Sequence, residues 1–231
     1  MINHGKPLLA LTAALLLAGC ASNGDPRDPL EPFNRGVQSF NDTVDRVAMK
    51  PIARGYRAVA PEPVQNSVRN FYSNLDDVTV FTNSLLQFRL EQATSDLLRI
   101  AFNSSFGLLG LIDIATPMGL KKHNEDFGQT LGRWGVGSGP YLVLPFFGPS
   151  SFRDGVGLAV DSATTDLVYD IEDIPTRNAA LVVRAVSHRA DLLDAQRALE
   201  EAALDNYEFT RDFYLERREA LVQDGRQQPA E

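Results

Sequence analysis

Large apolar side chains recur along this chain at the spacing of one helix face, and this repetition limits the possible fold more than any other feature. Between residues 33 and 49 the pattern is carried by Phe33, Val37, Phe40, Val44 and Val47. Steps of three or four place such side chains on one face of an α-helix, which turns once every ~3.6 residues. Almost no stretch alternates with a period of two, as a half-buried strand does. We therefore predict a mainly α fold.

Later segments repeat the pattern and predict further helices. Residues 64 to 86 and 91 to 102 carry apolar side chains on one face and Asn, Ser or Asp on the other. Residues 179 to 203 form the longest uninterrupted helical pattern, and a second helical piece follows to about residue 221. We expect Pro51 to break the first helix, because proline lacks a backbone N–H and crowds the preceding turn.

The amino-terminal residues have the form of an export signal. Residues 8 to 17 are uncharged and apolar, a run too short for a spanning helix of ~20 residues and typical of a signal sequence. Leu17-Ala18-Gly19-Cys20 follows, in the order of a bacterial lipobox. Cys20 is the only cysteine and therefore has no disulfide partner. We predict lipidation at Cys20; the alternative is a plain secretory signal and a free thiol.

These features divide the chain into four parts. We expect a signal peptide at 1–19, a lipidated tether rich in Pro and Asp at 20–32, a helical domain at 33–221 and a flexible tail at 222–231. Two or more acyl chains anchor a protein stably in a membrane. Ala21, which stands where Asp would favour retention in the inner membrane, points to the outer membrane of a Gram-negative cell.

The charge of the chain excludes one class of partner. The whole chain carries a net charge of −8, and the signal holds one Lys and no acid, so the mature protein carries −9. Phosphate backbones are bound by clustered Lys and Arg, and the sequence shows no cationic stripe. We expect no nucleic-acid partner.

The segment from residue 107 to residue 157 holds eleven of the seventeen glycines. We expect short helices and turns there, with backbone close to backbone. Residues 135–157 fail the tests for known loop chemistry. No Lys follows the glycines as in a Walker loop, Pro140 stands where a dinucleotide fingerprint needs glycine, and Ser138 lacks the flanking glycines of a nucleophile elbow.

Metal and catalytic chemistry find no support in the residues. After the signal the chain has two histidines, His123 and His188, whereas a zinc site needs three or four ligands. We predict no metal, no cofactor, no catalytic residue and no ATP-binding motif, and hence a protein that is not an enzyme. Asp113 lies within an apolar run and must cap, pair or face water. It is either a structural cap or a polar spot in a lipid passage.

Six segments in order resemble one protein family, the MlaA/VacJ lipoproteins. They are DPLEPFNR at 28–35, FN at 40–41, NFYSNLDD at 70–77, FNSSFGLLGLIDIAT at 102–116, the glycine-rich stretch at 125–157 and NYEFTRDFYLERR at 206–218. The resemblance implies a ring of amphipathic helices around a central amphipathic channel, lying in the inner leaflet of the outer membrane and facing the periplasm. It also implies a function: mislocalised phospholipids are removed from the outer leaflet and passed to a soluble periplasmic carrier, in association with a porin trimer.

The resemblance also nominates residues. It places residues 107–116 and 128–157 around the channel and makes Phe40 and Asn41 a candidate gating segment. The candidate channel or lipid-contact residues are Asp113, Tyr141, Leu142, Phe146 and Phe147. For the apolar run from Tyr141 to Phe147, ordinary core packing is the alternative.

Two other functions share some of these features. A structural lipoprotein that braces porins or the envelope would have no continuous polar-lined passage. A phospholipase would need a Ser or His whose replacement stops lipid hydrolysis.

Overall fold

The computed structural model describes residues 25–202 and 205–224, and helices dominate it. The elements are α2 (Glu31–Val44), the π-helix η1 (Asp45–Met49), α3 (Lys50–Val59), α4 (Glu62–Leu86), α5 (Leu90–Ser105), α6 (Phe127–Arg133), β1 (Tyr141–Leu144), β2 (Gly148–Ser151), α7 (Phe152–Thr164), α8 (Ile174–Ala202) and α9 (Asn206–Asp224). The predicted mainly α class is confirmed. Within the described residues, no helix has both the length and the apolar character needed to span a bilayer.

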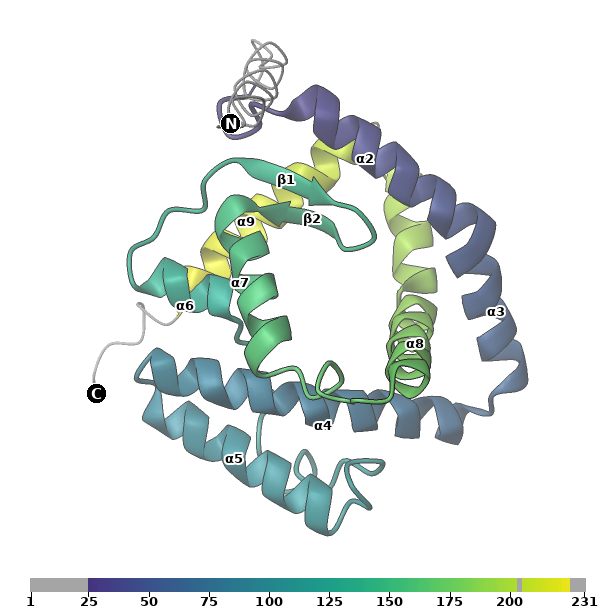
Figure 1. Cartoon of the computed structure of the whole chain (residues 1–231), viewed down its shortest axis with the longest axis vertical. Coiled ribbons are helices and arrows are strands. Elements are labelled where there is room, and N and C mark those ends of the chain that lie inside the picture. Colours follow the sequence, from purple (N-terminus) through teal and green to yellow (C-terminus); the bar gives the residue numbers. More distant parts are fainter. Residues whose placement is uncertain (1–24, 203–204, 225–231) are drawn as a thin grey trace, which may run out of the picture.

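The elements form a ring (Figure 1). Helices α2 and α3 make one curved side, α4 makes the base, and α7 with the β-hairpin makes the opposite side. Helix α8 lies inside the curve of α3, and the two pack through Ala53, Ala190 and Leu193. Helix α5 lies outside α4. The elements that surround the middle of the ring are therefore α4, α7, α8 and the hairpin.

The prediction that Pro51 breaks the first helix is wrong. Lys50 donates its N–H to the carbonyl of Asp45, five residues earlier, so a π-turn carries the chain from α2 into α3. Pro51 then lies in the first turn of α3, where a missing N–H is tolerated. The extra residue of a π-turn gives the curved side of the ring without a break.

The expected tether is shorter than the sequence indicated. Helix α2 begins at Glu31, and Asp28 is fully buried. The Asp28 carboxylate accepts a hydrogen bond from Asn34 Nδ2 at 2.8 Å and another from the Tyr207 hydroxyl of α9. The Tyr141 N–H donates to the carbonyl of Arg27 at 2.9 Å. Tyr141 and Tyr207 are distant from this segment in the sequence, so its composition alone indicated a tether. Cys20, the predicted lipidation site, lies outside the described residues.

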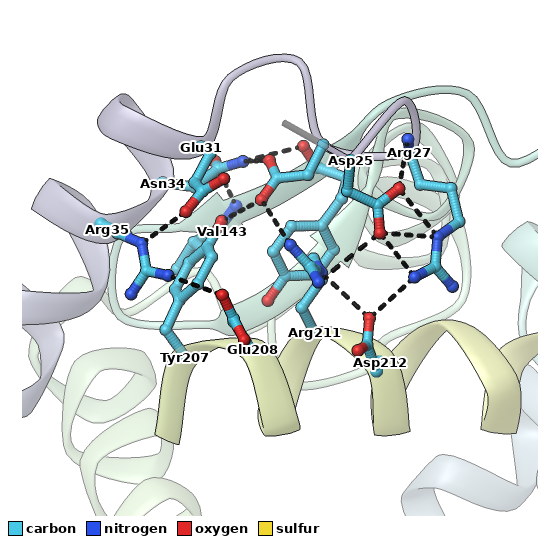
Figure 2. A network of polar contacts seen from close by, with 12 residues as sticks. Asp25, Arg27, Glu31, Asn34, Arg35, Val143, Tyr207, Glu208, Arg211 and Asp212 are labelled. Atoms are coloured by element: carbon cyan, nitrogen blue, oxygen red, sulfur yellow. Dashed lines mark hydrogen bonds and ion pairs between the residues drawn. The ribbon is translucent and has the colours of Figure 1, made fainter. Parts of the chain in front are cut away.

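Ion pairs secure the same corner of the ring (Figure 2). Arg27 binds Asp25 at 2.6 Å and Asp212 of α9 at 2.9 Å. Arg211 lies between Asp25 and Asp212 and contacts Asp212 at 3.0 Å. The first described residues are thus attached to α9, the last helix.

Close backbone approach, expected from the glycine content, is confirmed. A Cβ on Gly157 of α7 would collide with the backbone of Gly128 in α6, and one on Gly107 would collide with the carbonyl of Ile112. The hairpin was not predicted. Its strands have four residues each and pair antiparallel from Tyr141↔Ser151 to Leu144↔Gly148, too few for an alternating pattern to be recognised.

Many buried side chains are polar, and many large apolar side chains are exposed. In α4 the buried side chains include Asn74, Asp77 and Asn83, whereas Leu85 and Leu86 are exposed. Polar contacts join α4 to α5, including Ser84 Oγ to Asp96 at 2.8 Å. The most exposed large apolar side chains are those of Val47, Val59, Phe88, Phe106, Leu109 and Phe146. Large apolar side chains are therefore exposed on several elements, as on surfaces that contact a membrane, a ligand or another protein.

Candidate functional site: a central amphipathic cavity

A cavity of about 640 Å³ lies between α4, the hairpin turn, α7 and α8, the elements that surround the middle of the ring (Figure 1). Its lining combines two chemistries. The apolar part includes Phe146, Phe147, Leu158, Tyr169 and Leu181, and the charged part includes Arg69, Asp76, Asp166, Arg184 and Asp191. Such a surface can receive a molecule that has both a charged and an apolar end.

Arg184 of α8 holds the charged wall together. It forms ion pairs with Asp76 of α4 and with Asp166, the latter at 2.7 Å. Burial alone would lower the pKa of Arg184, but the two carboxylates outweigh this effect and raise it. A second cavity of about 470 Å³ shares these three residues and extends toward α6 and α9. The ion-paired cluster therefore lies where the two cavities meet.

A second ion pair lines another part of the central cavity. Arg69 of α4 contacts Asp191 of α8 at 2.9 Å. Because each of these cavity arginines has a carboxylate partner, the wall offers charge and hydrogen-bonding groups without a large excess of either sign.

The hairpin turn reaches the rim of the cavity and is held there by α2. Phe146, at a φ of 68°, and Phe147 are both exposed and both line the cavity. Asn41 Nδ2 donates to the Leu144 carbonyl at 3.0 Å, and the Phe146 N–H donates to Asn41 Oδ1 at 2.9 Å. The ring of Phe40 packs edge-on against that of Phe146, with centroids 5.4 Å apart. The structure thus brings the candidate gating pair into contact with the turn that carries two candidate lipid-contact residues.

Three other nominated residues do not line this cavity. Tyr141 is fully buried in a core cluster with Val143 and Tyr207, and burial raises its pKa. Leu142, next to it on β1, is half-buried. Tyr141 therefore packs in the ordinary core, which was the alternative to lipid contact for this run.

Asp113 lies in the segment after α5 and caps a turn. Its carboxylate accepts the N–H of Thr116 at 3.0 Å and lies 3.5 Å from Arg99. Burial would raise the pKa of Asp113, but the Thr116 hydrogen bonds and the Arg99 charge lower it. Asp113 therefore acts as a structural cap, which was one of the two alternatives for this residue.

Sequence reasoning missed the charged residues of the cavity. Asp76 and Arg184 were visible only as polar positions on long amphipathic helices, and Asp166 was not singled out. The histidines lie apart: His123 contacts Asp96 at 2.7 Å, whereas His188 lines the central cavity. Within the described residues, no group of three or more His, Cys, Asp or Glu could hold a metal ion.

Comparison with known proteins gives a consistent result. The family model described as MlaA lipoprotein matches residues 26–221. A relative from Escherichia coli named "Intermembrane phospholipid transport system lipoprotein MlaA" is 34% identical over 224 residues, which cover 94% of this chain and 88% of that protein. A relative of the same name from Haemophilus influenzae is 33% identical over 228 residues, covering 95% and 91%. A solved structure described as "Structural basis for maintenance of bacterial outer membrane lipid asymmetry" matches with a TM-score of 0.74 and 33% identity, covering 84% of this chain and 98% of that one.

Proposed function

The chain belongs to the MlaA lipoprotein family, and on this basis we propose that it removes mislocalised phospholipids from the outer leaflet of a Gram-negative outer membrane through its central cavity. The lipid then passes to a soluble periplasmic carrier. The ring lies in the inner leaflet, faces the periplasm and associates with a porin trimer. It contributes a path and no energy, so the direction of flow comes from lipid gradients or from partners.

One observation carries the proposal: a cavity with both charged and apolar walls in a body whose outer helix faces are apolar. A phospholipid has a charged head and two apolar tails, and an unpaired charge is very costly in hydrocarbon. Arg184 with its carboxylates and the Arg69–Asp191 pair offer polar contacts to the head. Phe146 and Phe147 offer apolar contacts to the tails.

The lipid anchor complements the apolar outer surface. Four residues separate Cys20 from Asp25, and the five extended steps between their Cα atoms span at most ~18 Å. Because Asp25 is attached to Arg27 and α9, acyl chains on Cys20 enter the membrane close to this corner of the ring. The anchor therefore supports embedding of the ring without a spanning helix.

Replacing the anchoring cysteine tests this part of the proposal. We expect Cys20→Ala to release the protein from the outer membrane and to abolish its function, because the remaining apolar faces do not replace two or more acyl chains. Fractionation of cells and the outer-leaflet phospholipid level are the measurements, with Ser22→Ala as the matched control. Full activity of an unlipidated protein contradicts the anchoring argument.

The hairpin turn gives a direct test of the passage. Asn41→Ala removes both hydrogen bonds that hold the turn at the cavity rim, so the resting width of the cavity is no longer fixed. We expect phospholipid to leak into the outer leaflet, where a membrane-impermeant amine label on intact cells measures phosphatidylethanolamine. Thr43→Ala is the control, because the Thr43 hydroxyl bonds only within α2, to the Ser39 carbonyl. An unchanged outer leaflet with folded Asn41→Ala protein argues against the gate.

The cavity favours transport over the two alternatives. A protein that only braces porins or the envelope needs no amphipathic cavity. A phospholipase needs a nucleophile activated by a base. Among the described residues, His123 contacts Asp96, and neither His123 nor His188 shares a hydrogen bond with a serine hydroxyl. Lipid hydrolysis by the purified protein would reverse this preference.

A further inference from the structure

A groove of about 480 Å³ between α3 and α8 carries a concentration of positive charge that is unusual for this chain. Lys50, Arg54 and Arg57 of α3 and Arg197 of α8 line it, and Asp194 is the one carboxylate among the described residues of the lining. The chain as a whole has a net charge of −8. The expectation that the sequence holds no cationic stripe is wrong for this segment, because Lys50, Arg54 and Arg57 recur at helical spacing on α3; only Arg197 comes from a helix that is distant in the chain.

The arginines of the groove differ from most arginines elsewhere in the fold. Arg184 and Arg218, for example, each bind two carboxylates. In the groove Arg57 pairs with Asp194 at 3.0 Å. Arg54 and Arg197 are exposed and, among the residues that the structure describes, have no ion-pair partner. Two guanidinium groups are thus available to an anion from outside.

Helix α3 presents this charge on one edge and apolar side chains on the other. At ~100° per residue, the cationic positions 50, 54 and 57 lie within roughly 60° of one another, and Ile52 and Val59 lie on the opposite side. Ala53 faces α8 between the two edges. Ile52 is 52% exposed and Val59 is 84% exposed. A helix with cations on one side and large apolar groups on the other is typical of a membrane–water boundary.

We propose that this groove binds the headgroup phosphates of anionic phospholipids in the leaflet around the ring, at a site separate from the central cavity. The proposal rests on the lipid setting of the proposed function. Guanidinium groups bind phosphate oxygens in a bidentate manner, and the groove supplies two of them beside Lys50. The cationic edge of α3 then lies at the headgroups and the Ile52–Val59 edge lies among the acyl chains, which fixes the depth of the ring.

Binding of soluble, short-chain lipids tests the site. The full chain, purified in detergent, is titrated with dihexanoyl phosphatidylglycerol or dihexanoyl phosphatidylcholine, and native mass spectrometry counts the lipids retained. The wild type is expected to prefer the anionic lipid. In Arg54→Glu/Arg197→Glu the preference falls by about tenfold or more, because each basic group near an anionic surface contributes roughly 1 kcal/mol.

A charge-matched control separates a local site from the overall charge. Lys121→Glu/Arg177→Glu changes the net charge equally at two cations outside the groove and is expected to keep the preference. The proposal is overturned if the Arg54→Glu/Arg197→Glu variant prefers the anionic lipid as strongly as the wild type does. It is also overturned if the wild type shows no preference, which is the result expected if the groove binds an acidic protein instead. Neither result depends on transport, which the Asn41→Ala variant tests in cells.

Discussion

Filling the central cavity by Ala185→Trp is expected to raise outer-leaflet phospholipid to the level of cells that lack the protein. Ala185 is an exposed residue of α8 that lines the cavity beside Arg184. An indole at this position occupies the space between the charged wall and the hairpin turn without removing any hydrogen bond or ion pair. The path for the lipid is blocked while the ring remains intact, so the whole transport activity is lost.

The measurement is the fraction of phosphatidylethanolamine that an impermeant amine reagent labels on intact cells. Ala179→Trp is the matched control, because Ala179 is exposed on the same helix and does not line the cavity. Normal labelling in cells that contain folded, membrane-bound Ala185→Trp protein places the lipid path elsewhere and removes the basis of the proposed function.

Replacing Arg218 by alanine is expected to lower the free energy of unfolding by about 3–5 kcal/mol, the usual effect of removing one partner from a buried ion pair. Arg218 of α9 binds Asp126, the residue before α6, at 2.6 Å and Asp154 of α7 at 2.9 Å. The Tyr214 hydroxyl also donates to Asp154, at 2.7 Å. Alanine leaves Asp126 without this cation and Asp154 with Arg153 alone, at 2.9 Å, and it weakens the attachment of α9 to α6 and α7. Denaturant unfolding in a mild detergent measures the loss.

The pH dependence of this loss identifies its cause. Burial would raise the pKa of Asp126 and Asp154, but Arg218 outweighs burial and lowers both. A lowered pKa contributes stability above the ordinary value of 3.8, and this stability is lost as the pH falls through the folded-state pKa. The difference between wild type and Arg218→Ala is therefore largest near neutral pH and narrows below about pH 4.

The neighbouring arginine is the control for that experiment. Arg217 is exposed, and Arg217→Ala is expected to change stability by no more than ~0.5 kcal/mol, as is usual for a surface substitution. A pH-independent loss in Arg218→Ala would assign its effect to packing of the arginine stem instead of to the carboxylates.

The helices could be predicted from the sequence because their periodicity does not depend on which face is buried. The longest predicted helix, 179–203, corresponds to α8 at Ile174–Ala202, and the pattern at 64–86 corresponds to α4 at Glu62–Leu86. The direction of the faces was not given by the pattern. Leu85 and Leu86 are exposed, whereas Asn83 is buried because its amide binds Asp161 of α7 at 3.0 Å.

The candidate site was predicted in part, and the limit has a physical reason. Phe40, Asn41, Phe146 and Phe147 were nominated through the family resemblance and lie together at the cavity rim. The Arg184 cluster was not found, because its carboxylates come from α4 and from the chain between α7 and α8. Pairing between polar faces of separate helices depends on their packing and leaves no local signal.

The polar contacts between helices, such as those that join α4 to α5, affect the heat capacity change of unfolding. In the membrane-embedded state that we propose, unfolding transfers little new hydrocarbon surface to water, and it is such transfer that gives unfolding its large positive heat capacity change. The heat capacity increment of this ring is therefore small, and its stability varies only gently with temperature. Hydrogen bonds between helices, such as that between Ser84 and Asp96, then keep the shape of the ring the same at low and at high growth temperature.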